Sequence, residues 1–294
     1  MKILVLGATG MLGSAIFRTL QNSEHFDVYG TLRDIEALRY FPVQMHAKLI
    51  SNIDVLDEDK LISVFERVRP NLVINCVGLI KQLACANDPL IVLPINAMFP
   101  HRLAKVCAQF ETRMIHISTD CVFSGRKGAY VESDRSDAED LYGKSKFIGE
   151  IPELSHVLTL RTSIIGHELN SHYALIDWFL SQKEQVKGYV NAIFSGLPTV
   201  ELTRVMRDFV IPRFDLSGLY HVAAKPINKY DLLNLVAEIY GKKIIIIPDE
   251  QVVIDRSLNA QRFREATGYV APEWPQLIEM MHKSHNFSGD ALNA

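Results

Sequence analysis

Short apolar runs rich in Val, Ile and Leu alternate with longer amphipathic segments over the first 165 residues, and this alternation constrains the fold most strongly. Such runs favour buried strands, and apolar residues spaced three and four apart favour helices. We expect strands at 2–6, 27–32, 72–76, 114–118 and 157–161, and helices at 11–21, 57–68, 94–110 and 139–151. This order predicts βαβ units and an α/β fold with a doubly wound parallel sheet.

The pattern changes after Ile165, where less regular segments follow. We expect a helix at 174–185, a turn at 196–199, a helix at 203–213, and then a strand–helix–strand unit at 219–223, 229–240 and 244–248. We therefore predict one domain over 1–165, to which parts of 200–245 also belong. Residues 166–294 should form mainly a smaller, partly interleaved C-terminal lobe that binds substrate.

Charge and composition exclude several classes of function. The net charge is −3, and the basic residues form no run longer than Lys242-Lys243, so nucleic acid is not an expected partner. No apolar stretch approaches the roughly 20 residues that span a bilayer. The four cysteines show no C-x-x-C pairing, which predicts reduced thiols and no metal site. We expect a cytoplasmic protein with a small-molecule substrate, for which a homodimer is the default assembly.

A glycine loop follows the first expected strand and opens the first expected helix. Its residues are Gly7, Thr9, Gly10, Met11, Leu12 and Gly13, with the spacing G-x-x-G-x-x-G. Glycines at this place let backbone N–H groups approach a pyrophosphate, which the positive end of the helix also favours. The loop therefore predicts a Rossmann-type dinucleotide-binding domain.

The residues after the second expected strand indicate which dinucleotide binds. Sites for NAD usually carry an acidic residue about 20 residues after the loop, whereas this chain offers Thr31 and Arg33. A hydroxyl and a guanidinium suit a 2′-phosphate, so we expect NADP(H), with NAD(H) as the alternative if Asp34 takes the acidic role. Asp54 and Val55 follow a third short extended segment, where they could meet the adenine or form a surface turn.

Tyr142 and Lys146 are spaced i and i+4 in an expected helix, which places them on one helical face. A neighbouring cation stabilises a phenolate, so this pair suits proton transfer. The pattern alone is weak, but the segment Ser118-Thr119-Asp120-Cys121-Val122-Phe123-Ser124-Gly125 ends a strand about 20 residues upstream.

Together these motifs resemble the extended short-chain dehydrogenase/reductases, and most of all the dTDP-4-dehydrorhamnose reductase family. Four further segments resemble motifs of that family and occur in the same order along the chain. They are Tyr130-x-Glu132-x-Asp134, Arg161-Thr162-Ser163, Gly196-x-Pro198-Thr199 and Arg256-Ser257-Leu258-Asn259. The resemblance covers essentially the whole chain. It implies NADPH-dependent reduction of the 4-keto group of a nucleotide-linked 6-deoxyhexose.

The resemblance also implies roles for individual residues. Tyr142 would donate the proton, Lys146 would lower its pKa and hold the nicotinamide ribose, and Thr119 would hydrogen-bond the ketone. The other implied positions are Cys76, Val77 and Gly78 along the cofactor groove, Thr162 beside the nicotinamide, and Asp120, Cys121 and Phe194 against the sugar.

Cys121 departs from the family, which commonly has tyrosine there, and the related dehydratases have glutamate. A thiol replaces that carboxylate poorly, so dehydration is not expected. A cysteine at this place and the histidine of Asn170-Ser171-His172 are similar to a proton-exchanging pair in GDP-fucose synthase, which leaves open an epimerase/reductase using Cys121 and His172. The family resemblance also extends to a non-catalytic regulatory subunit of methionine adenosyltransferase, so a binding module without chemistry is a third hypothesis.

Overall fold

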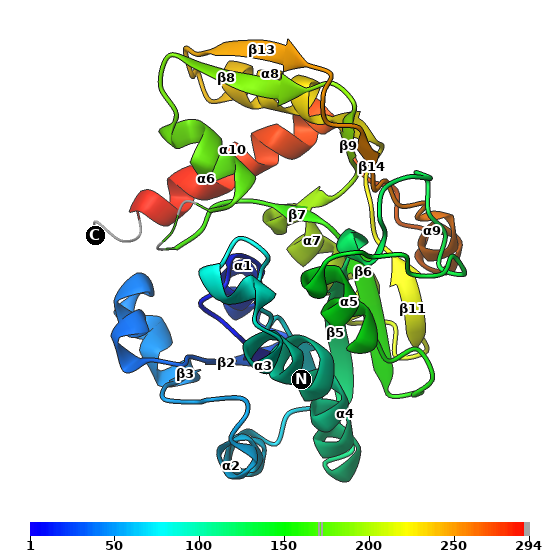
Figure 1. Ribbon diagram of the computed structural model, residues 1–294. Helices are drawn as coiled ribbons and strands as arrows, with labels where there is room; N and C mark the ends of the chain where they lie inside the picture. The colour runs from blue at the N-terminus through cyan, green and yellow to red at the C-terminus, as the bar shows by residue number, and fades with distance from the viewer. Residues whose placement is uncertain (170, 172, 291–294) are drawn as a thin grey trace.

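The computed structural model describes residues 1–169, 171 and 173–290, and its centre is a seven-stranded sheet (Figure 1). The strand order is β3-β2-β1-β4-β5-β6-β11, and every neighbouring pair is parallel. The strands are β1 (Lys2–Leu6), β2 (Asp27–Thr31), β3 (Leu49–Ile50), β4 (Leu72–Asn75), β5 (Arg113–Thr119), β6 (Val157–Thr162) and β11 (Gly218–His221). The predicted doubly wound fold is confirmed, with the chain reversing direction across the sheet between β1 and β4.

Helices cover both faces of this sheet because side chains of a strand alternate between faces. Ile3 and Val5 of β1 pack in one apolar core with α1 (Met11–Gln21), whereas Leu4 and Leu6 pack in a second core with α2 (Glu58–Val68) and α4 (Phe99–Gln109). A strand with both faces buried reads as a continuous apolar run, as the sequence of β1 does.

The helix expected at 94–110 starts earlier and is interrupted. It begins with α3 (Pro89–Leu93), where the Asp88 carboxylate accepts a hydrogen bond from Leu90 N at 2.9 Å, passes through a π-helical turn at Pro94–Met98, and continues as α4. Pro94 has no N–H to donate to the preceding turn, which favours a local change in the ladder. The helix expected at 139–151 is shorter, α5 (Leu141–Ile148), because Asp140 caps it.

The C-terminal lobe lies above the sheet in Figure 1 and differs more from expectation. The strand–helix–strand prediction was wrong as a unit, because β11 joins the main sheet whereas β13 (Ile245–Asp249) pairs with β8 (Gln185–Tyr189) in a separate one. In the sequence, α8 (Lys229–Ile239) lies between β11 and β13. The helix expected at 174–185 is α6 (Leu175–Ser181), which stops before β8.

The expected turn at 196–199 is instead β10 (Leu197–Pro198) followed directly by α7 (Thr199–Val205), and a π-helical turn at Met206–Val210 extends that helix. The remaining elements are β7 (Ile164–Ile165), β9 (Ala192–Phe194), β12 (Ile227–Asn228), β14 (Ile254–Asp255), α9 (Gln261–Thr267) and α10 (Trp274–Asp290).

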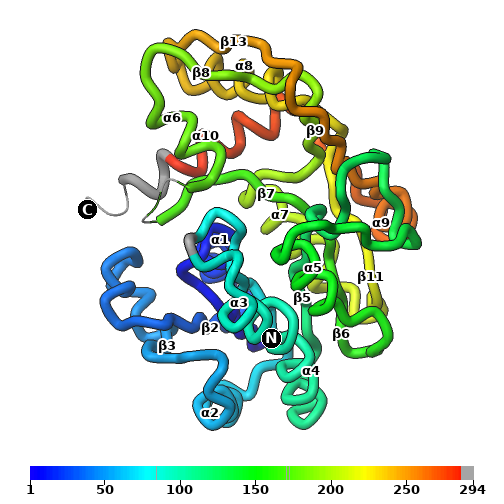
Figure 2. The backbone as a smooth tube through the Cα atoms, viewed as in Figure 1, coloured from blue at the N-terminus to red at the C-terminus, as the bar shows by residue number. Residues whose placement is uncertain are grey.

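The tube view in Figure 2 shows the chain crossing between the two parts more than once. It leaves the sheet after β6, returns as β11 and leaves again. The division into domains at residue 165 stays a prediction. Over the part of the chain that the structure describes, no helix combines the length and the apolar composition needed to cross a bilayer.

Candidate active site

The glycine loop is held closely against the end of β4. Gly7 has φ +79°, and a side chain there would meet Val77 Cγ2 at 3.1 Å. A Cβ on Gly13 would lie 2.1 Å from Gly7 O, so only glycine lets α1 begin this near the loop. Gly10 caps α1, with Met11 and Leu12 in its first turn. The loop is thus a backbone cradle that fits the diphosphate of a dinucleotide.

The residues predicted to recognise the 2′-phosphate have different surroundings. Thr31 is only 3% exposed, and its hydroxyl accepts a hydrogen bond from Gly7 N at 3.3 Å, so it supports the glycine loop from below. Arg33 is exposed just beyond the end of β2. Asp34 caps the following 3-10 helix by accepting from Glu36 N at 2.9 Å. Arg33 is therefore the predicted residue whose side chain is open to a phosphate.

Asp54 and Val55 lie in the turn after β3, where the Asp54 carboxylate accepts a hydrogen bond from Leu56 N at 3.0 Å. Asp54 is exposed and Val55 is half-buried against the second apolar core. The structure thus shows the surface turn expected for this pair, and contact with the adenine stays a prediction.

Asn96 connects the cofactor groove to the helix that carries Tyr142, and the sequence analysis missed it. It lies in the π-helical turn, is 1% exposed, and pairs with both backbone groups of Leu79, accepting from N at 2.8 Å and donating to O at 3.0 Å. It also donates to Ser145 Oγ on α5 at 3.3 Å. An asparagine two residues after a proline, inside a helical pattern, was the available signal.

Tyr142 and Lys146 lie on α5, which packs directly on the turn after β5. A Cβ on Gly143 would be 2.2 Å from Cys121 O, so glycine permits this approach. The Lys146 ammonium donates to Ile117 O at 2.7 Å, and a Cβ on Gly78 would be 3.8 Å from its Nζ. The structure thus brings Tyr142 and Lys146, the predicted catalytic pair, close to Gly78 and the end of β5.

Burial acts on the pKa values of this pair. It lowers the pKa of Lys146 to about 8, against a smaller opposing effect of the Glu150 carboxylate. It raises the pKa of the Tyr142 phenol well above its usual value, Cys121 adding to the shift, while a hydrogen bond with Thr119 opposes it. Near neutral pH the pair is therefore a neutral phenol beside a cation.

Thr119 and Asp120 end β5 and begin the loop that faces α5. Thr119 Oγ1 donates to the Asp120 carboxylate at 3.1 Å and accepts from Cys121 N at 3.1 Å. Asp120 is 8% exposed, and burial raises its pKa although Arg256 opposes the shift. Cations from the other lobe therefore help to keep the buried Asp120 carboxylate in its charged form.

Two cations from the C-terminal lobe face this loop. Arg256 donates to Phe123 O at 2.8 Å and approaches Cys121 Sγ at 3.7 Å. Lys229 is half-buried at the start of α8, and burial lowers its pKa while Asp120 and Cys121 raise it. A cavity of about 310 Å³ adjoins Lys229, with walls from α6, β8 and α8. Neither cation was a predicted site residue, since only the fold brings them here.

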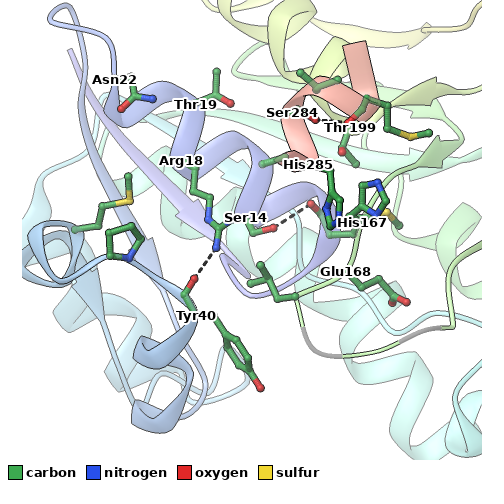
Figure 3. A pocket seen from close by; sticks show the side chains of 17 residues that line it. Ser14, Arg18, Thr19, Asn22, Tyr40, His167, Glu168, Thr199, Ser284 and His285 are labelled. Atoms are coloured by element: carbon green, nitrogen blue, oxygen red, sulfur yellow. Dashed lines mark hydrogen bonds between the residues drawn. The ribbon is translucent and has the colours of Figure 1, made fainter. Parts of the chain in front are cut away.

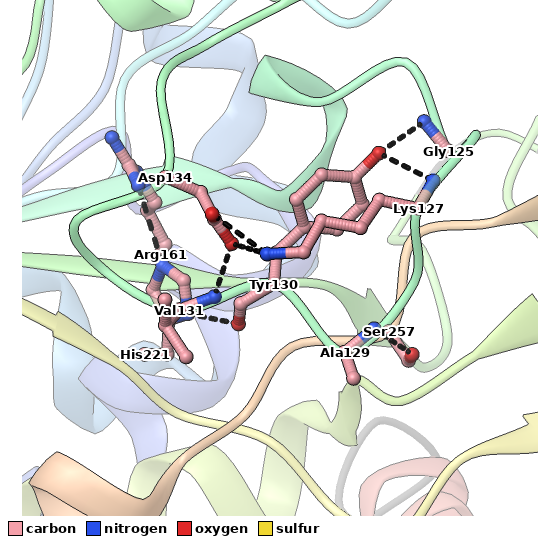
Figure 4. A network of polar contacts seen from close by, with 9 residues as sticks. All are labelled: Gly125, Lys127, Ala129, Tyr130, Val131, Asp134, Arg161, His221 and Ser257. Carbon is pink, nitrogen blue, oxygen red and sulfur yellow. Dashed lines mark hydrogen bonds and ion pairs between the residues drawn. The ribbon is translucent and has the colours of Figure 1, made fainter.

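The loop after Cys121 is held by Tyr130, whose ring stacks on Phe123 at 4.0 Å. Figure 4 shows its phenol oxygen between the backbone N–H groups of Gly125 and Lys127, each at 3.1 Å. Its own N–H donates to Ser257 O at 2.9 Å. Motifs more than 120 positions apart in sequence therefore join into one support for the site.

A buried ion pair fixes β6 beneath the same loop. Arg161 donates to both carboxylate oxygens of Glu150, at 2.8 and 2.7 Å, and both side chains are almost fully buried. Ser118 also donates to Glu150 at 2.6 Å, and Arg161 donates to His221, which in turn meets Tyr130 O at 3.1 Å. Glu150 is a second support residue that the sequence analysis did not identify.

The remaining predicted site residues fall into three groups. Cys76 is half-buried beside the Lys146 cation, and Thr162 is 2% exposed next to Thr119 across the strands. Phe194 is 8% exposed and packs on Trp274 with ring centroids 5.7 Å apart, so the structure places it in the core and not in an open sugar pocket. His172 lies outside the described residues.

A doubly wound parallel sheet, a glycine loop after β1, and a tyrosine and lysine one helical turn apart beside that groove define an extended short-chain dehydrogenase/reductase. The sequence matches the family model described as the RmlD substrate binding domain over residues 1–283. The chain belongs to this family, and the predicted class of oxidoreductase is confirmed.

Relatives of this chain are named for different functions. The dTDP-4-dehydrorhamnose reductase of Aggregatibacter actinomycetemcomitans is 24% identical over 255 residues, covering 83% of this chain and 81% of its own. Methionine adenosyltransferase 2 subunit beta of Danio rerio is 27% identical over 252 residues, covering 82% and 74%. A probable low-salt glycan biosynthesis reductase of Haloferax volcanii is 34% identical over 151 residues, about half of each chain at 51% and 48%.

Among solved structures, a dTDP-4-dehydrorhamnose reductase from Bacillus anthracis in complex with NADP superposes with a TM-score of 0.79. It is 20% identical and covers 96% of this chain and 98% of its own. The two chains therefore share a fold.

Proposed function

We propose that this protein reduces the 4-keto group of a nucleotide-linked 6-deoxyhexose with NADPH. The observation that carries the proposal is that α5, which carries Tyr142, packs on the end of β5, which carries Thr119, with the buried Lys146 cation one helical turn from Tyr142 beside the cofactor groove. The relative from Aggregatibacter actinomycetemcomitans, named for this reaction on a dTDP-sugar, supports the substrate class.

In this proposal the dinucleotide supplies the hydride when bound, and the side chains handle the proton. Tyr142 gives its phenolic proton to the ketone oxygen as negative charge develops there. Thr119 would donate a second hydrogen bond to the same oxygen, and for this its hydroxyl proton would turn from the Asp120 carboxylate to the substrate. Lys146 stabilises the phenolate that remains on Tyr142, and its charge below pH 8 supports that role.

The cations of the C-terminal lobe suit the nucleotide diphosphate of such a substrate. Lys229 borders the cavity of about 310 Å³, and the charges of Asp120 and Cys121 act on its pKa. A diphosphate near Lys229 would leave the sugar at Thr119 and Tyr142. The exposed Arg33 supports NADPH over NADH, because a guanidinium can bind a 2′-phosphate through paired hydrogen bonds.

The test is oxidation of NADPH with a panel of nucleotide-linked 4-keto-6-deoxysugars, using the wild type, Tyr142→Phe and Tyr220→Phe. We expect Tyr142→Phe to lower kcat by about 10²- to 10⁴-fold, the usual contribution of a general acid. Tyr220 lies on β11 and stacks on Arg262, so Tyr220→Phe should keep full activity. NADP⁺ affinity should be similar in all three proteins.

The other two hypotheses give different results in the same experiment. Solvent deuterium incorporated at C3 or C5 of the product would indicate epimerisation. Burial raises the pKa of the Cys121 thiol to about 12, so it is poorly suited to act as the base at neutral pH. Tight NADP⁺ binding with no turnover of any sugar would contradict the reductase and favour the regulatory-subunit hypothesis.

A further inference from the structure

A second and larger cavity, of about 470 Å³, lies along α1, and its walls include neither Tyr142 nor Lys146 (Figure 3). Its walls come from α1, from the segment around Tyr40 to Met45, from the loop at 167–169, and from the start of α7 and the end of α10. Figure 3 shows Ser14 and Arg18 of α1 on one side and Ser284 and His285 of α10 on the other. The cavity therefore lies between the two lobes, and its size is that of small-molecule sites.

Arg18 gives the cavity a cation without a carboxylate partner among the described residues. Its Nη2 donates to Tyr40 O at 2.5 Å, and its guanidinium carbon lies 5.4 Å from the centre of the Phe41 ring. These two contacts fix the side chain. Its Nε–H is buried and has no hydrogen-bond acceptor within the described part of the chain. A fixed guanidinium that lines the cavity and has no carboxylate partner among the described residues is a binding group for an anion.

The acidic side chains near the cavity are already engaged. Asp177 accepts hydrogen bonds from His167 Nδ1 at 2.5 Å and from Glu168 N at 2.6 Å, and Glu168 accepts from Ala174 N at 2.8 Å. His167 is held on its other side by Tyr240, at 2.9 Å. Neither carboxylate is paired with Arg18.

The rest of the wall is largely apolar. His285 stacks on His167 with ring centroids 3.8 Å apart, which gives a flat aromatic surface. Met11, Met45 and Met281 also line the cavity. Methionine side chains are flexible and polarisable, so such a wall adapts to apolar ligands of different shape.

We propose that this cavity binds a small organic anion with an apolar, planar body, whose anionic group pairs with the Arg18 guanidinium. The walls of this cavity include none of Thr119, Tyr142 and Lys146, and of the predicted cofactor-binding residues they include only Met11. Because its walls belong to α1 and to α10, a bound ligand bridges the two lobes.

The probe is 8-anilinonaphthalene-1-sulfonate, which combines an aromatic body with one sulfonate, titrated by fluorescence with the dinucleotide site saturated by NADP⁺. We expect saturable binding at one site. Arg18→Gln should weaken binding at least about tenfold, since it removes a charge-assisted hydrogen bond. Ala15→Phe should weaken binding strongly, because residue 15 lines the cavity and a phenyl group would take up part of its volume without deleting any polar contact.

Arg39→Gln is the matched control. Arg39 lies in the same 3-10 helix as Tyr40 and contacts that ring, but it is exposed and does not line the cavity. Its substitution should leave probe affinity unchanged. Ala15→Phe keeps the proposal testable if Arg18→Gln fails to fold. Probe binding that NADP⁺ removes, or that persists equally in Ala15→Phe, would overturn the proposal.

Discussion

Lys146 and Tyr142 lie one turn apart on α5, and burial shifts their pKa values in opposite directions. For each, the low dielectric disfavours the charged form, so the lysine loses its proton more readily and the tyrosine less readily. A phenol that stays protonated at neutral pH is suited to donate a proton, provided that the neighbouring cation remains.

This arrangement predicts the pH dependence of reduction. An exposed lysine has a pKa of about 10.4, whereas that of Lys146 is about 8, so the cation is present below pH 8 and is lost as the pH rises through it. We expect kcat/KM to fall as the pH rises above about 8, approaching tenfold per pH unit. Rates measured with NADPH from about pH 6 to 10 would check this.

Lys146→Arg is the control for that profile. An arginine keeps its charge over this range, so whatever activity the variant retains should not fall above pH 8. A wild-type profile that stays level to about pH 10 would contradict the assigned role of Lys146.

Elements meet in this site only because glycines let them approach closely. The start of α1 lies against Gly7 O, and α5 lies against Cys121 O, each at a place where a Cβ would overlap backbone. The π-helical turn at Pro94–Met98 has a related effect, since it includes Asn96, whose side chain reaches both Leu79 and Ser145.

The two glycines of the first turn differ in what a side chain would meet, and this predicts different stabilities. Gly13→Ala puts a Cβ 2.1 Å from Gly7 O and should lower the free energy of unfolding by about 1–3 kcal/mol. A Cβ on Gly10 would lie an ordinary 3.5 Å from Gly7 O, and the φ of −71° suits any residue. Gly10→Ala should therefore change the free energy of unfolding by less than about 0.5 kcal/mol. Urea unfolding without cofactor measures both, and equal losses would refute the steric argument.

At the scale of the whole molecule, apolar side chains gather outside the site on α3, α5 and the turn between α3 and α4. The most exposed are Leu90 (85%), Ile148 (55%), Met98 (47%), Phe147 (44%) and Ile91 (42%). Figure 1 shows these helices side by side on the face that carries α4. Large exposed apolar patches mark interaction surfaces, and we expect a second copy of the chain to cover this one.

The variant Leu90→Glu/Met98→Glu should therefore be monomeric, while the wild type should have twice the monomer mass by light scattering. Charges in the middle of an apolar interface would be buried unpaired, which opposes association. Val253→Glu changes an equally exposed residue of the other lobe and should stay dimeric. A monomeric wild type at micromolar concentration would rule out this interface.

The sequence by itself determined what depends on short-range pattern. The run of β1, the glycine loop and the start of α1 follow one another within 13 residues, and the i, i+4 spacing of Tyr142 and Lys146 fixes their common face. Periodicity and turn chemistry are local, so they can be read without knowing the partners of each segment.

Only the tertiary structure decided what depends on distant partners. β3 has only two residues, so the sequence indicated no more than a short extended segment there, and its pairing with β2 was decided by the tertiary structure. Phe194 could have faced the sugar or the core, and packing on Trp274 placed it in the core. Lys229 and Arg256 reach the loop after β5, and Arg18 faces α10 across a cavity, because the chain crosses repeatedly between lobes. Those contacts are set by topology and close packing, which no local pattern encodes.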